Sequence, residues 1–174
     1  EVAIMPASAA DDPIIIGCQG ALRKILLIDN TADNRSVLVN LLTPLGFGII
    51  EASNGQEGID KARQWQPDLI LTELVMPGMD GLTVIRTLRQ LPQFQEMPII
   101  AVSASVFEIH QQQSLAAGCN DFIAKPVRVQ VLLEKLRIHL KLTWRYESDT
   151  SAAADNTMAI DTASDGTTAL IGPS

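Results

Sequence analysis

Five short apolar runs recur along residues 22–146, separated by segments whose apolar residues are spaced as on one face of a helix. The runs show little polar alternation, which is typical of strands buried on both faces of a sheet. The predicted strands are Ile25–Ile28, Phe47–Ala52, Leu69–Thr72, Ile99–Val102 and Asp121–Ala124. The predicted helices cover residues 33–45, 55–65, 81 onward, 106–117 and 129–140.

Cap residues support two of these helices. Asp33 and Asp80 each precede a helical pattern, where a side-chain oxygen can accept a hydrogen bond from an amide of the first turn. Gly46 ends the first helix, because glycine readily adopts the left-handed conformation of a helix C-cap. Five strands alternating with five helices predict an α/β fold, a (βα)5 doubly wound parallel sheet. Right-handed crossovers favour the flavodoxin-like strand order 2-1-3-4-5.

Composition divides the chain into three regions. Residues 1–21 are rich in Ala, Pro, Gly and Asp, and we expect an N-terminal extension or linker. Residues 22–146 hold every periodic pattern and are expected to form one domain. Residues 147–174 are acidic, rich in Ser, Thr and Ala, and contain no Lys, Arg or aromatic residue. Such a segment is expected to be a flexible tail or linker.

Charge and composition exclude several classes of function. The formal net charge of -7 disfavours binding of this domain to nucleic acid or to an anionic membrane. No apolar run is long enough to span a membrane. Cys18 and Cys119 lie far apart and outside any CxxC motif, so reduced thiols are expected. His110 and His139 stand alone in the sequence and predict no zinc site.

Polar residues follow four of the predicted strands directly: Asp29–Asn30, Glu73, Ser103 and Lys125. Taken singly, a strand-end Asp or Ser more often serves a turn or a cap. In a doubly wound sheet, however, the ligand site lies at the carboxyl ends of the strands, so these side chains should share one crevice. Carboxylate and amide oxygens suit Mg²⁺, and an ammonium group suits phosphate. The set predicts a site for a divalent cation and a phosphoryl group.

Five segments form a specific combination around these residues: Ile28–Asn30, Pro67–Leu71, Met76–Gly81, Val102–Ala104 and Asp121–Pro126. With them, the chain resembles the receiver domains of response regulators and hybrid sensor histidine kinases. The resemblance covers Lys24 to about Trp144. The flanks Ile15–Gly20 and Leu142–Glu147 resemble the setting of a receiver joined to a hybrid sensor kinase.

The resemblance implies roles for the strand-end residues. Asp29, Asn30, Glu73 and the backbone carbonyl of Val75 occupy the positions that hold Mg²⁺, and Glu73 also occupies the phosphoacceptor position. Two of these residues depart from the family pattern, since Asn30 replaces an acid and Glu73 replaces the acceptor Asp. About one net negative charge remains at the site, against about two in the family pattern, so Mg²⁺ binding is expected to be weakened.

Three further roles follow from the same resemblance. Ser103 occupies the switch-hydroxyl position, Phe122 that of the aromatic switch, and Lys125 that of the partner of the phosphoryl group or acceptor carboxylate. The peptide bond before Pro126 is often cis in this family. Glu73 carries its carboxylate roughly 1.5 Å further than Asp, and a displacement near 1 Å can slow a reaction about a hundredfold. The longer carboxylate can instead reach Lys125 and Ser103 without metal.

The sequence therefore predicts a two-component receiver module that is phosphorylation-independent or constitutively active-like. The alternative is a functional phosphorelay receiver that accepts a phosphoryl group from a histidine kinase at Glu73 with Mg²⁺. The chain is predicted to be a regulatory domain rather than an enzyme, and the catalytic module of a hybrid kinase would lie outside it. An enzyme on this fold is disfavoured, because the sequence has no D-x-D after its first strand, no G-x-G-x-x-G and no flavin phosphate loop.

The expected partner is a histidine kinase or an output domain. By analogy with the family, it is expected to bind the face formed by the fourth helix, fifth strand and fifth helix. In this sequence that face includes Glu108, His110, Gln111, Gln112 and Arg128. A cytoplasmic location is expected for such a module.

Overall fold

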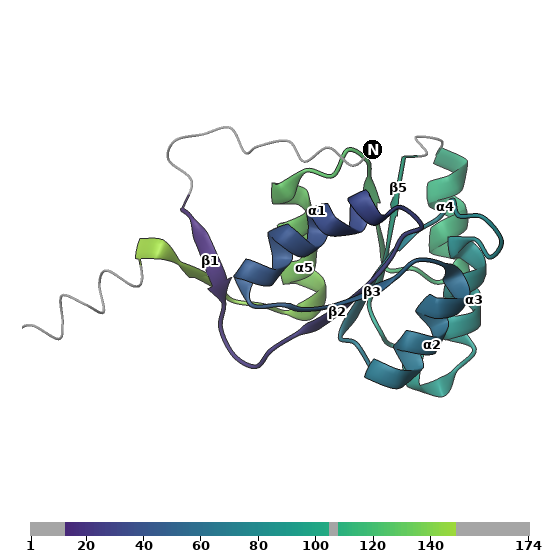
Figure 1. The fold of residues 1–174 in the computed structure, drawn as a ribbon, viewed down its shortest axis with the longest axis horizontal. Coiled ribbons are helices and arrows are strands. Elements are labelled where there is room, and N and C mark those ends of the chain that lie inside the picture. The colour runs from purple at the N-terminus through teal and green to yellow at the C-terminus, as the bar shows by residue number, and fades with distance from the viewer. Residues whose placement is uncertain (1–12, 105–107, 149–174) are drawn as a thin grey trace, which may run out of the picture.

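A five-stranded parallel sheet with helices on both faces forms the centre of the computed structural model, which describes residues 13–104 and 108–148 (Figure 1). The strands are β1 (Ile15–Cys18), β2 (Lys24–Ile28), β3 (Gly48–Ala52), β4 (Leu69–Glu73), β5 (Ile99–Ser103), β6 (Asp121–Ala124) and β7 (Trp144–Tyr146). The α-helices are α1 (Ala32–Leu42), α2 (Gly55–Trp65), α3 (Gly81–Arg89), α4 (Glu108–Ala117) and α5 (Val129–Leu140). Two short 3₁₀ helices, Thr43–Leu45 and Pro92–Phe94, follow α1 and α3.

The sheet has the strand order β3-β2-β4-β5-β6, and every neighbouring pair is parallel. Since β1 lies outside this sheet, the order equals the predicted 2-1-3-4-5, and the flavodoxin-like fold is confirmed. The strands are aligned so that Ile28 lies opposite Thr72 and Glu73 lies opposite Val102. All five strands therefore end at the same edge, which is where the polar strand-end residues were expected to meet.

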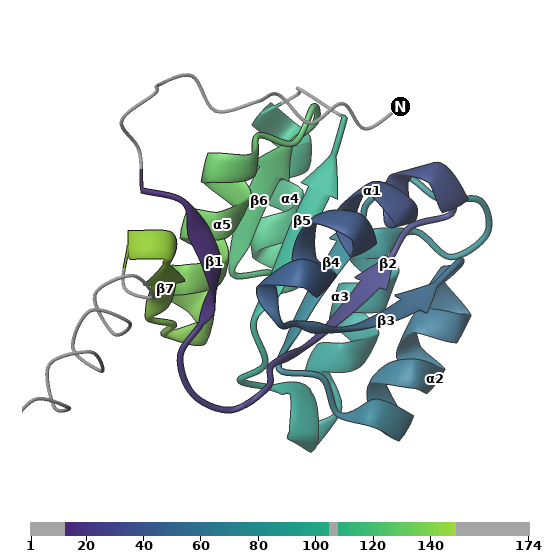
Figure 2. The ribbon, with the colours of Figure 1, turned by 60° about the vertical axis from the view of Figure 1, so that its left-hand side comes forward.

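Two apolar layers enclose the sheet, one on each face. Helices α1 and α5 cover one face, through buried residues that include Leu38, Leu42 and Leu136. Helices α2, α3 and α4 cover the opposite face, with Ile59, Val84 and other aliphatic residues buried against it. The two views of the ribbon show this three-layer arrangement (Figures 1 and 2). Burial on both faces explains why β4 and β5 read as continuous apolar runs.

The helix starts confirm one predicted cap and correct another. Asp80 precedes α3 as predicted, and its Oδ1 accepts a hydrogen bond from the Thr83 N–H at 2.8 Å. The prediction that Asp33 caps the first helix was wrong. Helix α1 begins at Ala32 with Thr31 as its N-cap, so Asp33 lies inside the first turn.

The other helices and strands begin and end close to the predicted residues. The first helix is α-helical only to Leu42 and continues as a 3₁₀ turn that contains Pro44, after which Gly46 takes a φ of 94°. Strand β3 begins at Gly48, one residue after the predicted start. Helix α4 is described from Glu108, and the predicted start at residues 106–107 lies outside the described residues.

A two-stranded antiparallel ribbon joins the two ends of the described chain, and the sequence pattern did not predict it. Strand β1, which lies within the predicted N-terminal extension, pairs with β7, so that Ile15 lies opposite Tyr146. The ribbon packs on the α1 and α5 side through Trp144, whose indole meets the ring of Phe47 edge to face, with centroids 6.2 Å apart. The pairing thus ties both flanks of the domain to its core.

Cys18 on this ribbon and the buried Cys119 are both free thiols, as expected. Among the residues that the structure describes, no helix is long and apolar enough to cross a membrane.

Candidate functional site

Three charged side chains predicted from the strand ends meet at the carboxyl edge of the sheet. Asp29 follows β2, Glu73 ends β4 and Lys125 follows β6. The Nζ atom of Lys125 lies 2.5 Å from Oε2 of Glu73 and 3.1 Å from Oδ2 of Asp29. Only 7% of the Lys125 and Glu73 side chains and 14% of the Asp29 side chain are exposed. One ammonium group therefore bridges two largely buried carboxylates.

Both carboxylate oxygens of Glu73 have a donor. Oε1 accepts hydrogen bonds from the backbone N–H groups of Leu74 at 2.9 Å and Val75 at 3.1 Å, while Oε2 faces Lys125. The chain turns directly after β4, so these two amides point back at the side chain that precedes them. Val75 itself is exposed, and the contact that it makes with Glu73 is through its N–H group. The arrangement holds the carboxylate in one orientation.

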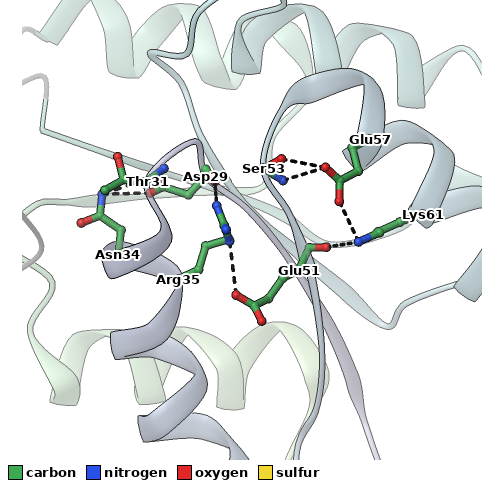
Figure 3. Close-up of polar contacts among 8 residues, drawn as sticks. All are labelled: Asp29, Thr31, Asn34, Arg35, Glu51, Ser53, Glu57 and Lys61. Atoms are coloured by element: carbon green, nitrogen blue, oxygen red, sulfur yellow. Dashed lines mark hydrogen bonds and ion pairs between the residues drawn. The ribbon is translucent and has the colours of Figure 1, made fainter.

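Asp29 is held by the first turn of α1 (Figure 3). Its Oδ1 accepts a hydrogen bond from the Thr31 N–H at 2.8 Å, an Asx turn that leads into the helix. The Nδ2 group of Asn34 lies 3.3 and 3.4 Å from its two oxygens. The guanidinium group of Arg35 donates to the Asp29 carbonyl at 2.6 Å and pairs with Glu51 at 3.2 Å. The carboxylate of Asp29 is therefore oriented toward Lys125.

Asn34 and Arg35 were not among the predicted site residues. Their position in the sequence could have indicated them, because the helix that follows β2 starts at the same edge of the sheet as Asp29.

The helix α2 that follows β3 starts with a comparable set of contacts, also seen in Figure 3. There Glu57 pairs with Lys61 at 2.7 Å and also accepts hydrogen bonds from Ser53, and these contacts, that with Lys61 first, lower the pKa of Glu57 to about 2.

The remaining predicted residues lie around this cluster. Ser103 is buried at the end of β5, and its backbone carbonyl accepts a hydrogen bond from the Lys125 N–H at 2.9 Å. Phe122 is half-buried on β6, opposite Ala101, and packs against the core on the α2–α4 side. The peptide bond between Lys125 and Pro126 is cis, as the family resemblance implied. Asn30 is exposed to solvent.

The predicted partner face is only partly described. His110, Gln111 and Gln112 lie on α4, and the exposed Arg128 precedes α5. The side chain of Glu108 lies outside the described residues.

The donors as arranged here do not fit a Mg²⁺ ion. Mg²⁺ takes octahedral oxygen ligands and usually keeps several waters. Lys125 already contacts both carboxylates. Within the described ranges, no group of three or more His, Cys, Asp and Glu side chains could hold a metal ion.

Comparison with known proteins matches residues 25–137 to the response regulator receiver domain. The chain is 32% identical over 120 residues to the sensor histidine kinase CheAY of Helicobacter pylori, a match that covers 68% of this chain and 15% of that kinase. It is 28% identical over 118 residues to the polar-differentiation response regulator DivK of Brucella anthropi, covering 68% of this chain and 96% of that regulator. The chain thus spans nearly all of one relative and a small part of the other.

Solved structures show the same fold. The chemotaxis protein CheY4 of Vibrio cholerae superposes with a TM-score of 0.66 at 26% identity, covering 69% of this chain and 100% of that chain. The receiver domain of the sensor histidine kinase PA1611 of Pseudomonas aeruginosa gives a TM-score of 0.65 at 28% identity, covering 70% and 99%. The PA1611 structure has a magnesium ion coordinated in its active site cleft.

Proposed function

Since this chain belongs to the response regulator receiver family, we propose that it is a two-component receiver module that acts without phosphorylation. Receiver domains are regulatory rather than catalytic, and they interact with histidine kinases or output domains. The observation that carries the proposal is the contact of 2.5 Å between Glu73 at the phosphoacceptor position and Lys125.

The geometry of Glu73 argues against efficient phosphoryl transfer. An attacking carboxylate oxygen must approach the phosphorus atom in a near-attack geometry, and a misplacement near 1 Å costs about a hundredfold in rate. Here Oε1 is held by two backbone amides and Oε2 by Lys125. Attack would require one oxygen to leave these donors, in addition to the misplacement caused by the longer side chain.

The same contacts support an active-like state. In the family, the lysine at this position pairs with the phosphoryl group, and here Glu73 already supplies a carboxylate oxygen to Lys125. A carboxylate carries one negative charge, whereas a phosphoryl group carries nearly two, so the mimicry is partial. We propose that this standing contact biases the domain toward the conformation that its partner binds.

A phosphorelay receiver that accepts a phosphoryl group at Glu73 is the second candidate. The observation that favours it is that Asp29, Ser103 and Lys125 lie at the same edge of the sheet as Glu73, as the family pattern requires.

For either candidate we propose a cytoplasmic location and a partner that binds the face of α4, β6 and α5. In either case we also propose that residues 22–146 form the receiver, that residues 1–21 are an N-terminal extension whose β1 packs on it, and that residues 147–174 are a tail or linker.

Intact mass spectrometry after incubation with Mg²⁺ and acetyl phosphate tests the two candidates. Wild type should stay unmodified, and the double variant Glu73→Asp with Asn30→Asp should gain one phosphoryl group, because it restores both the family's acceptor and the second acid of its metal site. Glu73→Gln is the matched control and should stay unmodified. A phosphoryl group on wild type that is absent from Glu73→Gln would replace our proposal with the phosphorelay reading.

A further inference from the structure

Lys125 lies between the two carboxylates from which a receiver of the usual kind would hold a divalent cation. We propose that its ammonium group is the resident cation of this site and that the receiver does not take up Mg²⁺. The inference rests on the proposed function in one respect, since a receiver that acts without phosphorylation has no need of the metal. Donor occupancy and charge each support it.

The oxygens that a metal would need are already engaged. The Glu73 carboxylate accepts two backbone N–H groups and contacts Lys125. The Asp29 carboxylate accepts the Thr31 N–H and lies within reach of Asn34 and Lys125. A Mg²⁺ ion would have to displace the ammonium group from both carboxylates, and it would also compete with N–H groups that belong to the fold.

The charge balance favours the ammonium group. Asp29, Glu73 and Lys125 together carry one net negative charge, so a bound divalent cation would leave the cluster positive. The third acid of the family pattern is replaced by the neutral amide of Asn30, which is exposed. Carboxylate charge sets the affinity of a site for hard divalent cations, and largely buried charges interact strongly. The cluster therefore carries one negative charge without metal and would carry one positive charge with it, so it lacks the surplus of carboxylate charge that favours a divalent cation.

Thermal unfolding of the full chain in EDTA and in excess MgCl₂, at matched ionic strength, tests the inference. A bound ion raises the unfolding midpoint by mass action, by several degrees once its concentration is about 100 times the dissociation constant. The midpoint of wild type should not change.

The unfolding midpoint of Lys125→Met should gain a saturable rise with Mg²⁺, because this variant removes the competing cation. Asn30→Asp should also gain one, while Asn54→Asp adds the same charge at the α2 N-cap and should not respond.

A saturable rise in wild type overturns the inference, and so does a folded Lys125→Met variant that ignores Mg²⁺. If Lys125→Met does not fold, Asn30→Asp decides: a rise supports the inference, and none overturns it. Intact mass spectrometry of the same samples with acetyl phosphate separates the two proposals. Wild type that binds Mg²⁺ and stays unmodified contradicts this inference alone, whereas wild type that gains a phosphoryl group contradicts the proposed function.

Discussion

The Nζ atom of Lys125 lies 2.5 Å from Oε2 of Glu73, and only 7% of either side chain is exposed. Lys125 directly follows β6 and Glu73 ends β4, and these two strands are separated in the sheet by β5. The contact therefore spans a strand and links the end of β4 to the segment that leads into α5. Both the proposed function and the stability of the carboxyl edge depend on it.

Replacement of Lys125 by Met should destabilise the domain by about 3–5 kcal/mol, because it leaves two buried carboxylates without their cation. Urea unfolding in EDTA followed by circular dichroism measures the change. Lys61→Met is the matched control, since Lys61 pairs with Glu57 where about a third of each side chain is exposed. That pair should contribute less than about 1 kcal/mol. Equal losses in the two variants would show that the Lys125 pair contributes no more than a surface pair.

Acid should weaken the contact between β6 and α5. The Asp121 carboxylate lies 2.7 Å from Nζ of Lys135 and 2.9 Å from Nε2 of His139. Burial alone would raise the pKa of Asp121, but hydrogen bonds with His139, Lys135 and the Phe122 N–H outweigh burial and lower it. Its contribution to stability is therefore full above the ordinary Asp pKa of about 4 and is lost as the pH falls through the lower folded-state pKa.

Unfolding free energies measured from neutral to acid pH should show a smaller acid loss in Asp121→Asn than in wild type. Asp60→Asn is a control on the exposed surface of α2, where Asp60 contacts Gln56, and it should keep the acid loss of wild type. If the unfolding free energy of Asp121→Asn fell with acid as steeply as that of wild type, Asp121 would not be the source of the acid loss.

The ribbon should contribute to the stability of the whole domain. Trp144→Ala removes a ring of which only 6% is exposed, together with its edge-to-face contact with Phe47. We expect a loss of about 3–5 kcal/mol in urea unfolding, as for other buried aromatic truncations. Trp65→Ala is the control, because Trp65 is 48% exposed, and it should cost much less. If wild type unfolded in two steps, with the ribbon opening first, the ribbon would not belong to the same cooperative unit as the rest of the domain, which would contradict this prediction.

Gly81 leaves room for the end of β4. A methyl group at this position would meet the backbone carbonyl of Glu73 and come within 2.8 Å of the Leu74 Cα atom. Gly81→Ala should therefore cost about 1–3 kcal/mol of stability, and it should disturb the amide resonances of Leu74 and Val75 that bind Glu73. Gly48→Ala, where the nearest atom would be 3.5 Å away, should leave those resonances unchanged.

The sheet was predictable because its strands are buried on both faces and so read as unbroken apolar runs. The meeting of Asp29, Glu73 and Lys125 followed from topology, since parallel strands end at one edge. The bridging position of Lys125 did not follow, because it depends on side-chain torsions. The ribbon was missed for a related reason: Ile15 and Tyr146 lie at opposite ends of the described chain, and no local periodicity signals such a pairing. The predicted cap was wrong by two residues. Thr31 holds the N-cap position of α1, and its N–H group donates to the Asp29 carboxylate in an Asx turn, so the helix starts before Asp33.

The ribbon also determines how the domain would yield under tension. In the antiparallel pair, Ile15 lies opposite Tyr146, and the Glu147 N–H donates to the Ile14 carbonyl at 3.0 Å. The chain therefore enters and leaves at the same end of the ribbon. A pull on residues 14 and 147 in opposite directions would open its hydrogen bonds one after another, beginning at that end, rather than shearing them together. The ribbon would give way first, and the load would reach β2 and α5 only after it had opened.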